Sequence, residues 1–402
     1  MDLVRIEDVE AARARIDDVI QTTPVERSRA VSDRVGHPVW LKAENLQRTG
    51  SFKIRGATNR IATLTAEERA RGVVCASAGN HAQGVALAAS TMDVAATVFM
   101  PIEAPLPKVD ACAGYGATVR LEGETFDESL AAAQAFAAER GSVFVHPFDH
   151  PDVIAGQGTL GLELLDQVPQ ATTVVVCCGG GGLVSGVAVA IKARRPDVRI
   201  VAVQAAGSAS FAGSLDAGEP RSVTQVDTIA DGIAVKQPGE LTLAHVRELV
   251  DEVVAVDDAA ISRAVVLLAE RAKMVVEPAG AAAVAALLSG AVELDGPTVA
   301  TLSGGNIDPL VLQHLVTAGL AAEGRFVTLR TRVPDSPGEL ARFLRAIADI
   351  RANVVGVEHH RLGSRLALGQ VEVIVELETR GPEHVARIRE ALARDGYPVA
   401  AL

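Results

Sequence analysis

The sequence predicts an α/β protein with helix-covered parallel sheets, followed by a smaller ferredoxin-like module. Between residues 73 and 302, short apolar runs that suit strands alternate with segments of helical character. This alternation is typical of parallel sheets. After about Gly324 the order becomes strand, helix, strand, strand, helix, strand, which is that of a ferredoxin-like module.

The first part of the chain contains several expected strands, helices and loops. Strands are predicted at residues 73–77, 95–100, 119–121, 143–146, 174–178, 198–203 and 299–302. Helices are predicted at residues 82–90, after Pro107, at 126–139 and at 183–194. Several polar or glycine-rich segments follow these strands directly, which is where parallel α/β folds bind ligands.

The last part of the chain has its own pattern. Strands are expected at 327–333, 354–358 and 371–377, helices at 340–347 and 385–392, and turns at 335–338 and 362–364. We place the domain boundary at residues 320–326, which leaves a first domain of residues 1–320 and a module of residues 326–402.

The composition excludes some classes of partner. The 402 residues include 38 Lys and Arg against 50 Asp and Glu, so the net charge is −12, and there are only 9 Phe, 1 Trp and 2 Tyr. An acidic chain with few aromatic residues is not expected to bind nucleic acid. An uncharged window at residues 167–191 contains Pro169 and four consecutive glycines, so we expect no membrane span.

The expected compartment is the cytoplasm. The first residues, Met1–Glu7, carry acids where a secretory signal needs basic and then apolar residues. The four Cys in this long chain do not suggest a disulfide framework, so reduced thiols are expected.

Four glycines, Gly179, Gly180, Gly181 and Gly182, stand between an expected strand and an expected helix that begins with Leu183. Their backbone N–H groups and the helix N-terminus suit a phosphate, although a tight turn would also use glycine. A P-loop would need Lys and Ser or Thr after the glycines, and a dinucleotide site would need an acid where Gln204 ends the next strand. A small phosphorylated cofactor therefore becomes the favoured ligand.

A lysine and a polar turn add to this pattern. Lys53 lies between Phe52 and Ile54, and an apolar setting can free a lysine amine for Schiff-base chemistry, although a solvated lysine is the common alternative. The turn from Ser77 to His81 joins an expected strand to an expected helix, where exposed N–H groups could hold a carboxylate. Simple helix capping by Ser77 or Asn80 is the alternative.

Together these segments resemble threonine dehydratase (threonine ammonia-lyase), a family of fold-type II pyridoxal-phosphate (PLP) enzymes. The resemblance rests on four segments in family order: Ser51–Ala57, Ser77–His81, Gly179–Gly182 and Ser303–Asn306. It spans about residues 5–320, and the segments Ala230–Gly232 and Glu277–Ala281 agree with it. The implied fold is tryptophan synthase β-like, with two parallel-sheet subdomains, the smaller at about residues 48–147. The C-terminal module is similar to an ACT domain around Asp335–Leu340.

The resemblance implies a role for each motif residue. Lys53 would bind PLP covalently and would then act as the general base at the substrate α carbon. The other expected cofactor contacts are Phe52, Asn80, Gly179, Gly180, Gly181, Gly182, Leu183 and Ser303. The substrate carboxylate would be held by Ser77, Gly79, Asn80 and His81, mostly through backbone N–H groups, so that His81 is not the base.

Two departures refine this expectation. Eukaryotic serine racemases are similar to this chain but carry a second Ser where Ala78 stands, so racemisation should be weak. Some relatives bind a divalent cation near Gln204, Ser208 and Ser210, but none of these side chains is a carboxylate. We therefore expect no divalent metal there, and a monovalent ion remains open.

The expected activity is PLP-dependent elimination from L-threonine to 2-oxobutanoate and ammonia, with weaker action on L-serine. The alternatives are an L-serine dehydratase or related β-eliminating enzyme, and an amino-acid-sensing regulatory protein with an inactive catalytic domain. The ACT-like module implies a branched-chain amino acid as effector, with Gly338 and Asn353 as candidate contacts, and a homo-oligomer, either dimer or tetramer. Isoleucine biosynthesis and threonine breakdown both fit this pattern.

Overall fold

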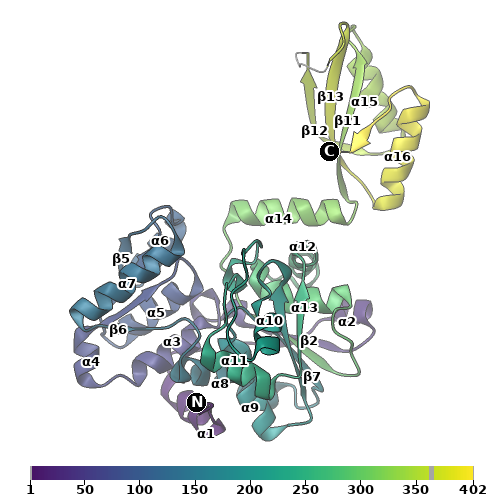
Figure 1. Ribbon diagram of the computed structural model, residues 1–402. Helices are drawn as coiled ribbons and strands as arrows, with labels where there is room; N and C mark the ends of the chain where they lie inside the picture. Colours follow the sequence, from purple (N-terminus) through teal and green to yellow (C-terminus); the bar gives the residue numbers. More distant parts are fainter. Residues whose placement is uncertain (1, 362–365, 402) are drawn as a thin grey trace. The chain divides into compact units, whose positions relative to one another are not determined.

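The computed structural model describes residues 2–361 and 366–401 (Figure 1). The chain divides into two compact units, residues 1–312 and 313–402, and each is described by itself.

The first unit contains a large sheet with strand order β1-β2-β10-β7-β8-β9. Its strands are Val25–Arg27, Val39–Ala43, Thr298–Leu302, Thr173–Cys177, Arg199–Ala205 and Glu252–Val256, in that spatial order. Neighbouring strands are parallel except β1, which pairs antiparallel with β2. The central strands are buried and rich in Val, as expected for a sheet covered on both faces.

A smaller sheet in the same unit has the order β5-β4-β3-β6 and is entirely parallel. Its strands are Thr118–Leu121, Ala96–Met100, Val73–Ala76 and Val143–Phe144. The predicted α/β class with two parallel sheets is confirmed. The expected strand at 143–146 is shorter than predicted, since only Val143 and Phe144 are regular strand, although Val145 N still donates to Val74 O at 2.8 Å.

Helices cover both sheets of the first unit (Figure 1). They are α1 (Ile6–Ile16), α2 (Arg29–Val35), α3 (Lys53–Ala62), α4 (Ala66–Arg71), α5 (Asn80–Thr91), α6 (Leu106–Gly114), α7 (Phe126–Arg140), α8 (Pro151–Gln167), α9 (Gly182–Arg194), α10 (Ser210–Ala217), α11 (Glu240–Leu249), α12 (Asp258–Leu267) and α13 (Pro278–Ser289). No helix among the described residues is both long enough and apolar enough to cross a membrane.

Four charged side chains lie inside the first unit, where α3 and α8 meet. Arg55 on α3 donates from Nε to Glu44 Oε2 at 2.7 Å and from Nη1 to Glu163 Oε1 on α8 at 2.6 Å. Lys42 of β2 donates to Glu163 Oε2 at 2.5 Å. All four are buried, and their two positive and two negative charges balance, which is the condition under which buried charges are tolerated.

The second unit has the predicted order of strands and helices: β11 (Phe326–Pro334), α15 (Glu339–Asp349), β12 (Asn353–His360), β13 (Gln370–Glu378), α16 (Pro382–Arg394) and β14 (Ala400–Ala401). The strands form one antiparallel sheet in the order β12-β13-β11-β14. The turn expected at 362–364 lies outside the described residues.

The division between the units falls inside α14 (Pro309–Ala322), whereas the sequence placed the boundary at residues 320–326. The helical spacing of apolar residues in α14 continues on both sides of Gln313, with Leu312 before it and Leu315 after it. Because one helix crosses this point, its pattern offers no signal for a boundary there.

Candidate active site

The predicted cofactor and substrate residues of the first unit line one cavity of about 970 Å³. They lie in loops and at helix starts beside both sheets: Phe52, Lys53, Ser77, Gly79, Asn80, His81, Gly179, Gly180, Gly181, Gly182, Leu183 and Ser303. Polar groups that are distant in the sequence thus converge on one hollow, as in small-molecule sites.

A tight turn places Lys53 at the start of α3. Thr49 and Gly50 both have positive φ, at 62° and 70°. A Cβ on Gly50 would lie 2.3 Å from Asn306 Oδ1, so this turn has no room for a side chain. Ser51 then pairs with Gly304. The lysine segment is therefore joined to the late Ser-Gly-Gly-Asn turn.

The side chain of Lys53 is partly buried. Its Nζ donates to Pro147 O at 2.9 Å and lies 5.3 Å from the centre of the Phe52 ring. Desolvation by burial lowers the pKa of Lys53 to about 8, against the attraction of negative charge at Cys177 and Glu277. A neutral amine is the nucleophilic form, so this environment suits covalent chemistry.

The glycine loop joins β7 to the N-terminus of α9. Gly181 has a φ of 91°, which favours glycine, and a Cβ there would lie 2.7 Å from Phe211 Cζ. A Cβ on Gly180 would lie 2.4 Å from Phe148 Cδ1. The loop thus presents backbone, and the first N–H groups of a 13-residue helix follow it. This arrangement fits a phosphate group.

Asn80 lies at the start of α5 with its amide contacted on both sides. Its Nδ2 donates to Glu277 Oε1 at 2.7 Å, and its Oδ1 accepts from Asn306 Nδ2 at 2.8 Å. Burial raises the pKa of Glu277 to about 7, although the hydrogen bond from Asn80 opposes the shift.

The remaining predicted residues are held by local contacts. Gly79 N donates to Ser77 Oγ at 3.1 Å. Ser303 Oγ accepts from Cys177 Sγ at 3.1 Å. His81 Nε2 lies 2.8 Å from Val145 O, and burial, with the nearby charge of Lys53, lowers its pKa to about 3. His81 is therefore neutral at physiological pH, and this ring nitrogen is engaged by backbone.

Sequence reasoning gave no role to Glu277, Asn306 or Cys177, all of which line the cavity. Glu277 and Asn306 stand in segments that supported the family resemblance. A Glu directly before the Pro that begins α13 was the available signal, because a carboxylate there can be buried at a helix N-terminus.

The stretch considered for a cation begins near the end of β8 and continues into α10. Gln204 accepts from Phe211 N at 3.0 Å, and Ser208 Oγ donates to Ile233 O at 3.1 Å. Both side chains and Ser210 are buried. Gln204 and Ser208 are thus hydrogen-bonded to backbone groups. The stretch contains no carboxylate to attract a hard cation.

The candidate effector residues belong to the second unit. Gly338 has a φ of 91° and precedes α15. Asn353 begins β12, and its Nδ2 donates to Glu378 Oε2 at 3.1 Å.

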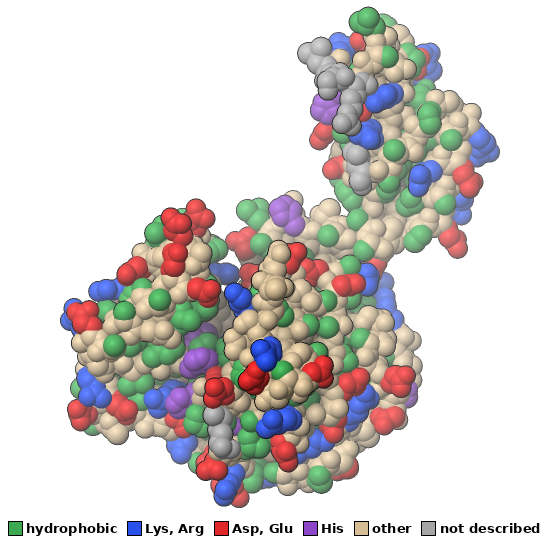
Figure 2. All heavy atoms as spheres, in the orientation of Figure 1, with side chains coloured by type: hydrophobic (Ala, Val, Ile, Leu, Met, Phe, Trp, Pro, Cys, Tyr) green, Lys and Arg blue, Asp and Glu red, His purple; other side chains and the backbone are tan. Residues whose placement is uncertain are grey.

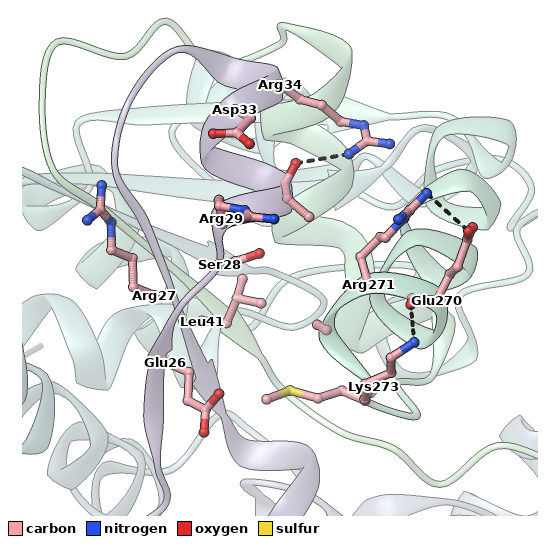
Figure 3. Close-up of a pocket in the computed structure, with 13 residues that line it drawn as sticks. Glu26, Arg27, Ser28, Arg29, Asp33, Arg34, Leu41, Glu270, Arg271 and Lys273 are labelled. Atoms are coloured by element: carbon pink, nitrogen blue, oxygen red, sulfur yellow. Dashed lines mark hydrogen bonds and ion pairs between the residues drawn. The ribbon is translucent and has the colours of Figure 1, made fainter.

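A second pocket of about 510 Å³ lies beside α2 and shares no lining residue with the larger cavity. In Figure 3, Arg271 pairs with Glu270, and Lys273 donates to the Glu270 backbone carbonyl. Acids and bases are mixed in this pocket, and Figure 2 shows the same mixture across the visible face of the first unit.

Comparison with known proteins agrees with this geometry. The family model described as pyridoxal-phosphate dependent enzyme matches residues 16–304. A protein named L-threonine ammonia-lyase from Thermotoga maritima is 46% identical over 398 residues, covering 99% of each chain.

Solved structures of the same fold include maize serine racemase, with a TM-score of 0.75 and 38% identity over 78% of this chain and 97% of that one. The processed form of threonine deaminase isoform 2 from Solanum lycopersicum has a TM-score of 0.74 and 38% identity, covering 78% and 86%. The chain therefore belongs to the fold-type II family of pyridoxal-phosphate dependent enzymes, in its threonine dehydratase branch.

Proposed function

We propose that this chain is an L-threonine ammonia-lyase that forms 2-oxobutanoate and ammonia and acts more weakly on L-serine. The observation that carries the proposal is the partly buried Lys53 amine, which shares one cavity with a glycine loop that suits a phosphate. The relative from Thermotoga maritima, named for this activity, covers nearly the whole chain.

The chain has a matching group for each part of pyridoxal phosphate. Lys53 Nζ would bind the aldehyde, and the N–H groups of Gly179–Gly182 and Leu183 would hold the phosphate. The Asn80 amide would donate to the phenolic oxygen, Phe52 would lie against the ring, and the Ser303 hydroxyl would meet the ring nitrogen. When bound, the cofactor takes up electrons released at the substrate α carbon.

The side chains around the substrate divide the remaining work. The N–H groups at the start of α5, from Ser77 to His81, suit the substrate carboxylate because a helix N-terminus attracts anions. Lys53 Nζ is the base that removes the α proton, since its pKa near 8 keeps a useful neutral fraction at physiological pH. His81 stays a structural group on Val145 O.

Ala78 argues against racemisation as the main reaction. Inverting the α carbon requires a proton donor on the face opposite Lys53, and an alanine side chain has no transferable proton. Intact Lys53, Asn80 and Ser303 argue against a sensor with an inactive catalytic domain.

Steady-state kinetics on L-threonine and L-serine test the proposal. We expect 2-oxobutanoate and ammonia in equal amounts, with kcat/KM higher for threonine than for serine. A higher kcat/KM for serine than for threonine would support the alternative of an L-serine dehydratase. A colourless protein that remains inactive with added cofactor would support the sensor.

We further propose that residues 326–402 form an ACT-like regulatory domain, with residues 1–320 as the catalytic domain and a small subdomain at about 48–147. The antiparallel sheet with two helices supports an ACT-like domain. A branched-chain amino acid is the proposed effector, with Gly338 and Asn353 as candidate contacts.

A homo-oligomer, either dimer or tetramer, is proposed from the edge of this sheet. β12 is an edge strand on which Val355 and Val357 are 59% and 40% exposed. An exposed apolar edge strand invites pairing with another chain. Light scattering that gives only the monomer mass would remove this proposal.

The proposed compartment is the cytoplasm. Cys75, Cys112, Cys177 and Cys178 are free and buried. Free buried thiols fit a reducing compartment.

A further inference from the structure

The amide of Asn80 can adopt only one orientation. Its Nδ2 faces the Glu277 carboxylate at 2.7 Å and its Oδ1 faces the Asn306 amide nitrogen at 2.8 Å. A flipped amide would place two NH₂ groups together and an oxygen against a carboxylate, so both contacts would be lost.

Asn306 is itself anchored. Its Nδ2 also donates to Thr49 O at 2.6 Å, in the positive-φ turn before Lys53. Both protons of the Asn306 amide are thus used, one on Asn80 and one on the lysine segment. The orientation of Asn80 is therefore coupled to the backbone that carries Lys53.

Glu277 places a carboxyl group in the interior, which costs desolvation free energy that an apolar side chain would not lose. It is only 8% exposed, and within the described ranges it forms no ion pair. Gly304 leaves room for it, because a Cβ there would lie 2.3 Å from Glu277 Oε1. Burying a carboxyl without an ion pair costs free energy, and among the described residues its side chain is hydrogen-bonded to Asn80 alone.

We propose that Glu277 and Asn306 are positioning residues that fix the Asn80 amide and leave its second N–H for the phenolic oxygen of the cofactor. Glu277 holds the nitrogen side, and Asn306 holds the oxygen side. Neither residue needs to touch the cofactor. The proposal rests on the cofactor assignment and is independent of which amino acid is the substrate.

Three variants of the full-length holoenzyme test this role. Glu277→Gln keeps a carbonyl oxygen that can accept from Asn80. Glu277→Ala and Asn306→Ala each remove one of the two hydrogen bonds that orient the Asn80 amide. Ser289→Ala, at the exposed end of α13, is the matched control. Three quantities are measured: the Kd of the cofactor, the visible absorbance maximum and kcat.

Glu277→Ala and Asn306→Ala should each raise the cofactor Kd roughly 10-fold, the ratio expected for one lost buried hydrogen bond of about 1.4 kcal/mol. Both should shift the absorbance maximum in the same direction and lower kcat. Glu277→Gln should retain values within about 3-fold of the native ones, as Ser289→Ala should.

Two results would overturn the proposal. One is a native Kd and spectrum in either alanine variant. The other is a folded Glu277→Gln that is as impaired as Glu277→Ala, which would assign the role to charge and not to orientation. If Glu277→Ala fails to fold, Asn306→Ala decides. Cofactor Kd and spectrum require no substrate, so a wrong choice of threonine would leave this test intact.

Discussion

Burial sets the reactivity of Lys53. An exposed lysine amine is almost entirely protonated at neutral pH and is then neither a nucleophile nor a base. Desolvation lowers the pKa of Lys53 to about 8, because the protonated form loses its water while the neutral form loses little. The same residue in a solvated loop would carry no such chemistry.

The pH dependence of cofactor capture follows from this shift. In protein stripped of cofactor, the neutral fraction of Lys53 should rise about tenfold between pH 7 and pH 9 and then level off. The capture rate, followed by absorbance, should therefore rise with a midpoint near pH 8, whereas the rate for Nα-acetyl-lysine should still be rising at pH 10. A rate that tracks the model amine up to pH 10 would show that Lys53 has an ordinary pKa.

Lys53→Ala should abolish elimination and leave the fold intact. The variant loses both the covalent attachment and the base, so turnover should fall by at least roughly 10⁴-fold. Circular dichroism and product formation measure the two properties. Turnover near the native level in the folded variant would assign the proton transfer to another group.

At the scale of elements, the glycine loop between β7 and α9 presents backbone N–H groups to the cavity. Strand β7 ends at Cys177, and the chain must reach the first turn of α9 without side chains between the loop and its neighbours. Gly180 lies against the Phe148 ring and Gly181 has a positive φ. Glycine is needed at both positions for these two different reasons.

Gly180→Ala should weaken cofactor binding strongly. A Cβ 2.4 Å from Phe148 Cδ1 forces the loop or the ring to move, so the cofactor Kd should rise by at least about 10-fold. Gly213→Ala on α10 is the matched control, because a Cβ there meets no atom within 4 Å. We expect the control to bind cofactor normally. Equal cofactor affinity in both variants would contradict the proposal that the glycine loop binds the cofactor phosphate.

The buried charges between α3 and α8 hold the helix that carries Lys53. Glu163→Gln removes one negative charge and leaves Lys42 and Arg55 with Glu44 alone. We expect the free energy of unfolding of the first unit to fall by about 3 kcal/mol. Urea unfolding followed by the fluorescence of Trp40, the single tryptophan, measures it.

The control for this change lies on the same helix. Asp166 is 59% exposed and pairs with Arg13 at 3.4 Å, so Asp166→Asn should cost at most about 1 kcal/mol. A Glu163→Gln variant no less stable than Asp166→Asn would show that the buried cluster contributes little.

At the scale of the whole molecule, the two units differ in architecture. The first unit contains the cavity and the parallel sheets, and the second contains an antiparallel sheet with an exposed edge at β12. A small unit joined to a complete catalytic unit suits regulation. Coupling between two sites is a difference in affinity between states of the protein, so it must appear in the kinetics.

Isoleucine or valine should therefore change the kinetics of threonine turnover. We expect an effector to alter the apparent KM by about 5-fold or more, the range of typical coupling free energies. Asn353→Ala should reduce that response and leave the basal rate unchanged. Flat rates across a titration of both amino acids would remove the regulatory proposal.

Much of the fold could be predicted because strands and helices leave local patterns. The runs at residues 174–178 and 183–194 coincide closely with β7 and α9. The antiparallel edge strand β1 left no comparable signal, because its pairing depends on a distant partner. The strand predicted at residues 143–146 is regular only at Val143 and Phe144 of β6, because only these two residues pair with β3. The division inside α14 likewise left no signal, because the helix continues across it.

The sequence by itself determined the chemistry available: a lysine in an apolar motif, a run of four glycines and polar turns after strands. Residues close in the chain decide these features, so they can be read from the order of amino acids. Only the tertiary structure decided that Glu277 and Asn306 hold the Asn80 amide from two sides, and that burial lowers the Lys53 pKa. Desolvation and hydrogen-bond geometry depend on segments as far apart as 257 residues, and folding alone brings those segments together.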